Sequence, residues 1–180
     1  VTSHATTAFY DELDGALSRK VYRARPGTVG VCGLIQNHYG WDAVPHLLCL
    51  GFSRQETEDV LLDLAYLGVH NILALRGDGP NFDKKSNSFH THNLYASDLV
   101  EQIVALNNGG LLDGLPSKGF DFCVGVAGYP EKHFEAANLA QDLMNLKRKV
   151  DAGAEYVVTQ MFFDNQRFFE FVKAARAIGI

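Results

Sequence analysis

Short apolar runs alternate with longer amphipathic stretches along most of this chain. Residues 45–50 (PHLLCL) are apolar almost throughout, which predicts a strand buried on both faces. Ser53 with Glu56 three residues later predicts a capping box at a helix start, and Gly68 predicts the left-handed end of that helix. Residues 71–75 are again short and apolar. Together these signals predict a β-α-β unit.

The same alternation continues toward the C-terminus. We expect Ser97 and Asn165 to cap helices, because their side-chain oxygens can accept free backbone N–H groups. The further strands are expected at 120–127 and 156–163, and the further helices at 97–106, at 135–152 and from Asn165 onward. A helix over 28–39 is also expected, whereas the pattern of 11–25 fits neither element clearly. Residues 79–93 and 107–118 are polar and predict surface loops.

Strands that alternate with helices predict a parallel sheet with right-handed crossovers. An open doubly wound sheet and a β/α barrel both fit this pattern. No G-x-G-x-x-G follows a predicted strand, which favours the barrel. Such a barrel usually takes about 250 residues, and only four clear strands are predicted. We therefore expect an α/β fold, a (β/α)8 TIM-type barrel that is incomplete in this chain, with its first strand and its last strands missing.

Composition narrows the range of partners. The 180 residues carry a formal net charge of -5 and no basic stripe, which argues against a nucleic-acid partner. No run reaches the ~18 apolar residues of a membrane span, and no segment reads as a signal peptide. The three cysteines include no C-x-x-C pair, so we expect a reducing, cytoplasmic location. His90 and His92 lack a third ligand in the pattern, and no metal site is expected.

Candidate chemistry lies just beyond the predicted strands, where β/α barrels carry their functional residues. Arg76-Gly77-Asp78 follows one strand, Tyr129 to His133 follows another, Gln160 lies near the end of a third and His46 lies in the first. Each residue also fits a structural role, such as a turn with a local ion pair for Arg-Gly-Asp. Gln160, in an apolar run, predicts a buried amide that needs partners.

One predicted helix carries a polar cluster. Asp142, Asn145 and Lys149 share a face at i, i+3 and i+7, with Arg148 beside them. One acid, one amide and two cations can hold a ribose hydroxyl and a pyrophosphate. Spacing alone favours an ordinary solvated face, because most surface helices have such a face.

Six segments, in order, resemble the methylenetetrahydrofolate reductase family over nearly the whole chain. They are VPHLLC (44–49), ALRGD (74–78), YASDLV (95–100), YPEKH (129–133), NLKRKVDAGA (145–154) and TQMFFD (159–164). The resemblance implies that residues 1–180 are a partial catalytic, FAD-binding β/α barrel domain. It implies that NADH or NADPH reduces FAD and leaves, and that 5,10-methylenetetrahydrofolate is then reduced to 5-methyltetrahydrofolate. A homo-oligomer is also expected.

The resemblance also implies residue roles. Asp78 and Gln160 correspond to catalytic, substrate-binding positions: Asp78 to a carboxylate that tunes the flavin, Gln160 to an amide that contacts the folate and the nicotinamide. Thr2 corresponds to a weaker nucleotide contact. The implied flavin-binding residues are His46, Arg76, Gly77, Asp78, Tyr95, Ala96, Tyr129, His133, Ala136, Asp142, Asn145, Arg148 and Lys149.

The chain departs from the family pattern at two places. Ser3-His4 stands where some members have Tyr-Gly. The proton-donating glutamate of the family, in a Phe-Glu-Phe-Phe-Pro-Pro-like motif, has no match in this sequence, and the final strands are absent. Two alternatives therefore stay open: another FAD barrel oxidoreductase, such as a proline dehydrogenase-like enzyme, and a non-catalytic remnant.

Overall fold

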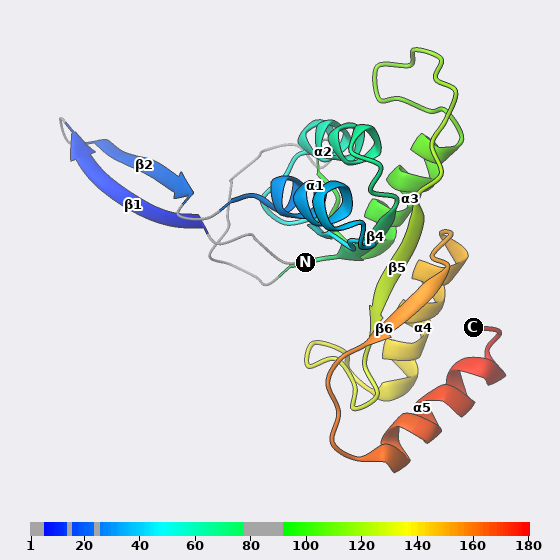
Figure 1. The fold of residues 1–180 in the computed structure, drawn as a ribbon. Helices are drawn as coiled ribbons and strands as arrows, with labels where there is room; N and C mark the ends of the chain where they lie inside the picture. The colour runs from blue at the N-terminus through cyan, green and yellow to red at the C-terminus, as the bar shows by residue number, and fades with distance from the viewer. Residues whose placement is uncertain (1–5, 14–15, 24–25, 78–91) are drawn as a thin grey trace.

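The computed structural model describes residues 6–13, 16–23, 26–77 and 92–180. A four-stranded parallel sheet with helices packed against it forms most of this part, and a two-stranded antiparallel sheet precedes it (Figure 1). The elements run in the order β1 Thr6–Leu13, β2 Ala16–Arg23, α1 Thr28–Tyr39, β3 His46–Leu48, α2 Arg54–Tyr66, β4 Asn71–Leu75, α3 Ala96–Asn107, β5 Cys123–Gly128, α4 Leu139–Asp151, β6 Tyr156–Thr159 and α5 Asn165–Ala177.

The strands of the main sheet lie side by side in chain order, β3-β4-β5-β6, and every pair is parallel. One row of in-register partners crosses the whole sheet: His46 with Leu73, Leu73 with Gly125, and Gly125 with Tyr156. The prediction of four neighbouring parallel strands is confirmed. Right-handed crossovers between strands in this order place the connecting helices on one face of the sheet.

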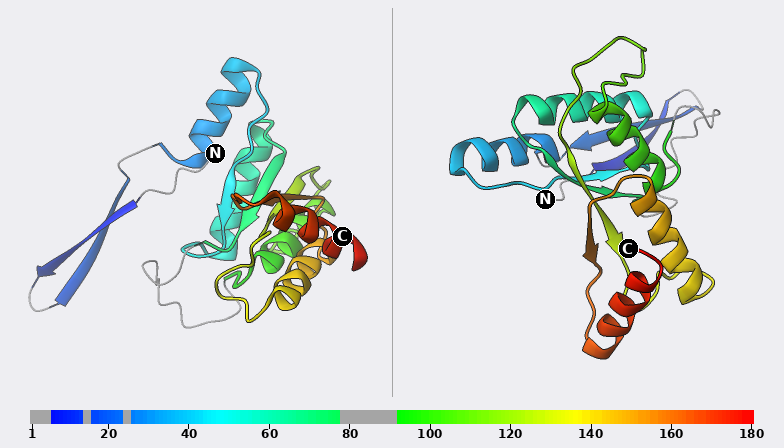
Figure 2. Two further views of the ribbon diagram at one scale, coloured as in Figure 1. Left: turned by 90° about the horizontal axis from the view of Figure 1, so that it is seen from below. Right: turned by 90° about the vertical axis from the view of Figure 1, so that its right-hand side faces the viewer.

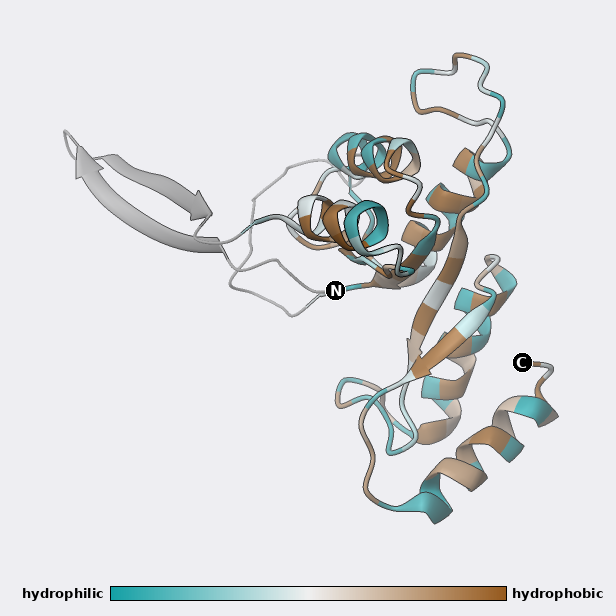
Figure 3. Ribbon diagram, viewed as in Figure 1, coloured by the Kyte–Doolittle hydropathy of each residue, from teal (hydrophilic) through white to brown (hydrophobic). Residues whose placement is uncertain are grey.

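The two faces of the sheet differ in burial. Ile72, Ala74, Val124 and Val126 are at most 1% exposed and belong to the core cluster. This core also holds the apolar stripes of the helices, which alternate with polar positions along each helix (Figure 3). Side chains alternate between the faces of a strand, and the opposite face is more open, with Val158 44% exposed. The core members from the helices include Leu61, Leu64, Leu99, Ile103, Leu143 and Leu146.

Helix α2 forms as its sequence predicts. The Ser53 hydroxyl accepts from the Glu56 N–H, and the Glu56 carboxylate accepts from the Ser53 N–H. At the other end, Gly68 has φ 72°, and the Val69 N–H donates to the Leu64 carbonyl at 2.9 Å. This is a Schellman-type end, in which the glycine adopts a conformation that is strained for other residues.

Several predicted helix caps and element boundaries are wrong. Helix α3 begins at Ala96, and the Asp98 carboxylate, not Ser97, accepts the free N–H groups of Leu94 and Tyr95. Helix α5 is capped by Asp164 and not by Asn165. Helix α4 begins after the Asn138 cap, later than expected. Strand β6 ends at Thr159, earlier than expected, because its pairing with β5 ends at Gly128.

The hairpin β1–β2 pairs eight residues with eight in antiparallel register and projects away from the main sheet (Figures 1 and 2). It occupies the region where the sequence pattern leaves the element type open. The described helices include none long and apolar enough to cross a membrane. Taken together, the described residues form an α/β fold with a four-stranded parallel sheet and five helices, which is consistent with part of a β/α barrel.

Candidate functional site

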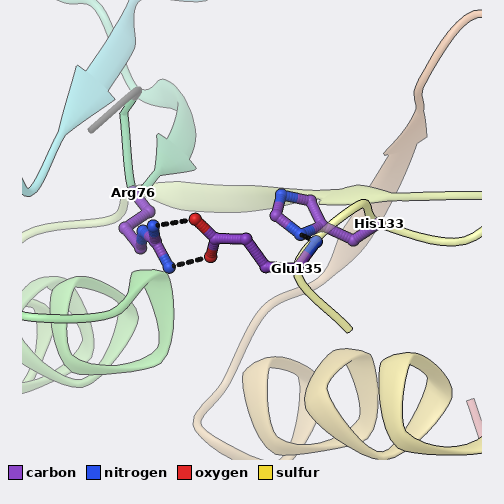
Figure 4. A network of polar contacts seen from close by, with 3 residues as sticks. All are labelled: Arg76, His133 and Glu135. Atoms are coloured by element: carbon purple, nitrogen blue, oxygen red, sulfur yellow. Dashed lines mark hydrogen bonds and ion pairs between the residues drawn. The ribbon is translucent and has the colours of Figure 1, made fainter. Parts of the chain in front are cut away.

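The carboxyl ends of β4 and β5 bring together residues that lie far apart in the sequence. Arg76 directly follows β4, and its guanidinium donates to both carboxylate oxygens of Glu135 at 2.6 and 2.8 Å (Figure 4). Glu135 lies in the loop after β5, and its own N–H donates to Nδ1 of His133 at 3.2 Å. The ion pair raises the pKa of Arg76 and lowers that of Glu135.

The loop between β5 and α4 is held by its own side chains. Lys132 has φ 78°, the one positive value at a non-glycine residue in the described ranges. Its ammonium donates to the carbonyls of His133 at 2.9 Å and Ala136 at 2.7 Å. The rings of Tyr129 and His133 meet edge to face, with centroids 4.6 Å apart. Three residues predicted to bind the cofactor are therefore fixed in one short loop.

Helix α4 connects to this loop through its first turn. Asp142 is 9% exposed and accepts the His133 N–H at 2.8 Å. Asn145, one turn later, accepts from Gln141 at 3.1 Å and from Arg148 at 3.3 Å. The predicted polar face thus exists, but its acidic member is buried against the loop rather than solvated.

Lys149 lies at the inner edge of the same face. Its ammonium donates to the Ala127 carbonyl of β5 at 2.5 Å. Burial lowers the pKa of Lys149 to about 8, while the charge of Asp142 acts in the opposite direction. Arg148, by contrast, is exposed. The two cations that were predicted together therefore have different surroundings, one largely buried and one in solvent.

Tyr95 and Ala96 lie at the start of α3, beside the end of β3. The Tyr95 carbonyl accepts from the thiol of Cys49 at 3.3 Å, and the Tyr95 side chain is 59% exposed. Cys49 also donates to the Leu75 carbonyl, and burial raises its pKa to about 12. This thiol is a structural link between β3, β4 and α3, since a reactive cysteine requires a lowered pKa.

The side chain of Gln160 is not buried as predicted. The residue directly follows β6, and its backbone N–H donates to the Gly128 carbonyl at 2.7 Å. Its side chain is exposed, and its Oε1 accepts from the Met161 N–H at 2.9 Å. The expectation of a buried amide is wrong, because β6 has a neighbouring strand on only one side among the described residues.

The remaining predicted residues fall in two groups. Gly77 continues the loop after Arg76 with φ 90°, and His46 begins β3 in the row of Leu73 and Gly125. Asp78 and Thr2 lie outside the described residues.

The family description "Methylenetetrahydrofolate reductase" matches residues 5–180. This chain belongs to the methylenetetrahydrofolate reductase family. The 5,10-methylenetetrahydrofolate reductase of Salmonella typhimurium is 38% identical over 189 residues, covering 99% of this chain and 57% of that protein. The Escherichia coli protein of the same name is 38% identical over 146 residues, covering 81% and 43%. A probable methylenetetrahydrofolate reductase (NADPH) of Caenorhabditis elegans is 35% identical over 144 residues, covering 80% and 20%.

The chain therefore spans about half the length of the bacterial reductases it matches. Sequence reasoning missed two residues that organise this edge of the sheet, Lys132 and Glu135. Glu135 had a detectable signal: it follows one predicted strand at a short distance, as Arg76 follows the neighbouring one, and parallel strands end at the same edge. The positive φ of Lys132 has no counterpart in the sequence pattern, because lysine is not a residue that favours this conformation.

The residues at this edge fit a dinucleotide such as FAD in their chemistry. Arg148 and Lys149 supply two cations one helical turn or less from the Asn145 amide, which suits phosphate and hydroxyl oxygens. The exposed Tyr95 and the rings of Tyr129 and His133 add aromatic groups that suit the flat rings of such a ligand. Within the described ranges, no three His, Cys, Asp or Glu side chains gather as a metal site would need.

Proposed function

We propose that the protein carrying this chain reduces 5,10-methylenetetrahydrofolate to 5-methyltetrahydrofolate, with hydride from NADH or NADPH passed through noncovalently bound FAD. The family membership carries this proposal. The structural support is the meeting of residues from the ends of β4, β5 and α4 at one sheet edge, where β/α barrels hold their ligands. We further propose that the four-stranded sheet is an arc of such a barrel and that the protein is a cytoplasmic homo-oligomer.

The bound FAD would supply the hydride chemistry, and the chain would bind and orient it. Arg148 and Lys149 would hold the phosphates, and Asn145 a hydroxyl or phosphate oxygen. Tyr95, Tyr129 and His133 would pack against the rest of the cofactor, with His46, Gly77, Ala96 and Ala136 shaping its pocket. The buried Asp142 would act indirectly, because its carboxylate accepts the His133 N–H and so holds His133 in place.

Two residues are proposed to act on the substrates. The Asp78 carboxylate would favour the cationic iminium form of the folate, because a nearby negative charge stabilises a developing positive one. The amide of Gln160 is exposed, and would contact the pterin in one half-reaction and the nicotinamide in the other. Thr2 would make a weaker nucleotide contact.

The test uses the complete protein that carries this chain. It should be yellow, and denaturation should release FAD and not FMN. NADH or NADPH should bleach the flavin absorbance in a stopped-flow instrument, and methylenetetrahydrofolate should restore it. Bleaching by proline would instead identify a proline dehydrogenase-like enzyme, and a protein without flavin would be the non-catalytic remnant.

Asp78→Asn separates the two half-reactions. The variant keeps the shape of the side chain and deletes its charge. Flavin oxidation by methylenetetrahydrofolate should slow by about 100-fold, the size typical of one preorganised electrostatic group. Flavin reduction by NADH or NADPH should slow far less. Equal losses in both half-reactions would reduce Asp78 to a structural role.

A further inference from the structure

The Arg76–Glu135 pair joins the loop after β4 to the loop after β5. The residues lie 59 positions apart, and both carboxylate oxygens are used, at 2.6 and 2.8 Å. Two parallel bonds between a planar guanidinium and a carboxylate fix the plane of the guanidinium as well as its position. Exposed ion pairs are generally weak, but this bidentate geometry is the exception.

Both ends of the pair are anchored. The Arg76 carbonyl accepts the Leu50 N–H at 3.0 Å, which extends the β3–β4 ladder beyond the strands. On the other side, the Glu135 N–H is bonded to His133, whose own N–H is bonded to the buried Asp142. The Lys132 ammonium donates to two backbone carbonyls of the same loop. The carboxylate is thus presented to Arg76 by a loop whose backbone is already ordered.

We propose that Glu135 is a positioning residue, which orients Arg76 and cancels its charge so that Arg76 binds an uncharged part of the ligand. The pair uses two of the five N–H donors of the guanidinium, and the others stay available to a carbonyl or hydroxyl oxygen. A phosphate gains little from a cation that a carboxylate already neutralises. The cations left for phosphate are those of α4: Lys149, and Arg148, whose described contact is an amide.

This inference rests on the proposed FAD site and assigns its parts: the sugar-alcohol or ring oxygens to Arg76, the diphosphate to α4. The isolated pieces of the cofactor can distinguish the two. Riboflavin carries the ring and the sugar alcohol without phosphate, and ADP carries the diphosphate without the ring. The variant is Glu135→Gln, and the matched control is Glu131→Gln, which removes the same charge from the same loop without breaking the pair.

Binding is measured by titration of the complete, flavin-free protein with each probe. Glu135→Gln should weaken riboflavin binding by about fivefold to tenfold, the range of one charge-assisted contact that loses its orientation. ADP binding should stay within about twofold, and Glu131→Gln should change neither affinity. Tighter ADP binding in Glu135→Gln would overturn the proposal, because Glu135 would then be competing with phosphate for Arg76. Unchanged riboflavin binding would overturn it as well.

A second measurement needs no ligand. Phenylglyoxal modifies free guanidinium groups, and peptide mass mapping reports each arginine separately. In the natural protein, Arg76 should react more slowly than the exposed Arg148. In Glu135→Gln, Arg76 should react about as fast as Arg148. Equal rates at Arg76 in both proteins would show that the pair does not hold. If the natural protein binds no flavin while Arg76 is protected, the proposed function fails and the orienting contact stands.

Discussion

Replacement of Lys149 by methionine should make the protein more stable and its cofactor site weaker. The ammonium of Lys149 is held near the Ala127 carbonyl in largely buried surroundings, and burial lowers its pKa from 10.5 to about 8. At pH 7 the folded protein therefore carries a charge that its surroundings disfavour. Methionine keeps most of the apolar stem and removes that charge.

The magnitude follows from the pKa. A fall from 10.5 to about 8 corresponds to about 3 kcal/mol of unfolding free energy lost at pH 7, since one pKa unit is worth about 1.4 kcal/mol. The variant recovers this amount but loses the hydrogen bond to Ala127, worth about 1 kcal/mol. Lys149→Met should thus raise the unfolding free energy by about 2 kcal/mol at pH 7.

The lowered pKa of Lys149 also sets how the unfolding free energy depends on pH. Between pH 8 and 10.5 the unfolded chain still binds a proton at Lys149 and the folded protein does not, so this group adds stability as the pH rises. Below pH 8 its cost is constant. The advantage of Lys149→Met should therefore shrink above pH 8 and vanish near pH 10. Taking the difference between the two proteins cancels the other groups that titrate there.

Urea denaturation at pH 7, 8, 9 and 10, followed by circular dichroism, measures these differences. Lys147→Met is the matched control: Lys147 lies on the same helix and pairs with Asp151 at i,i+4, a contact worth about 0.3–0.5 kcal/mol. FAD affinity should fall about tenfold in Lys149→Met, as expected for one lost charge-assisted contact. A Lys149→Met protein less stable than the natural one at pH 7 would show that the buried charge of Lys149 costs less than its contacts contribute.

Three further substitutions test the framework. Gly125→Ala places a Cβ 2.2 Å from the Tyr156 ring, so urea denaturation should show a loss of about 1–3 kcal/mol, whereas an unchanged midpoint would mean that the ring moves freely. Asp142→Asn weakens the acceptor of the His133 N–H, so it should lower the unfolding free energy by about 1–2 kcal/mol and speed hydrogen exchange at that amide. Unaltered exchange would show that other contacts hold the loop. Ser53→Ala removes the capping box of α2 and should cost about 1 kcal/mol in thermal unfolding, a loss that Ser53→Thr should largely avoid.

The sequence predicted the ends of an element correctly where the interactions that set those ends are local. Ser53, Glu56 and Gly68 interact within a few residues of one another, and the helix they delimit has the predicted bounds to within a residue or two. The buried strands were equally readable, because a strand covered on both sides must be apolar almost throughout. The chirality of the crossovers then sets the face of the sheet that the helices cover, whereas the order of the strands, β3-β4-β5-β6, is given by the structure.

The ends of helices and strands that depend on residues distant in the sequence could not be predicted from it. Helix α4 was expected to include Glu135, but that carboxylate is bound to Arg76, 59 positions earlier, and Asn138 caps the helix instead. Strand β6 was expected to continue past Gln160, yet its pairing ends where β5 ends, at Gly128. Spacing alone also left the face of Asp142 undecided between solvent and ligand, because its bond to the His133 N–H is tertiary.

The agreement between strand order and chain order has a consequence for how this protein acquires its shape. Among the described residues, each strand of the main sheet pairs with the strand that precedes it in that sheet. During translation, each new β-α unit meets an edge that is already formed. The search for partners stays short-range, which lowers the entropic barrier to forming parallel pairs. Within the part of the chain that the structure describes, each strand thus serves as the edge to which the next β-α unit adds.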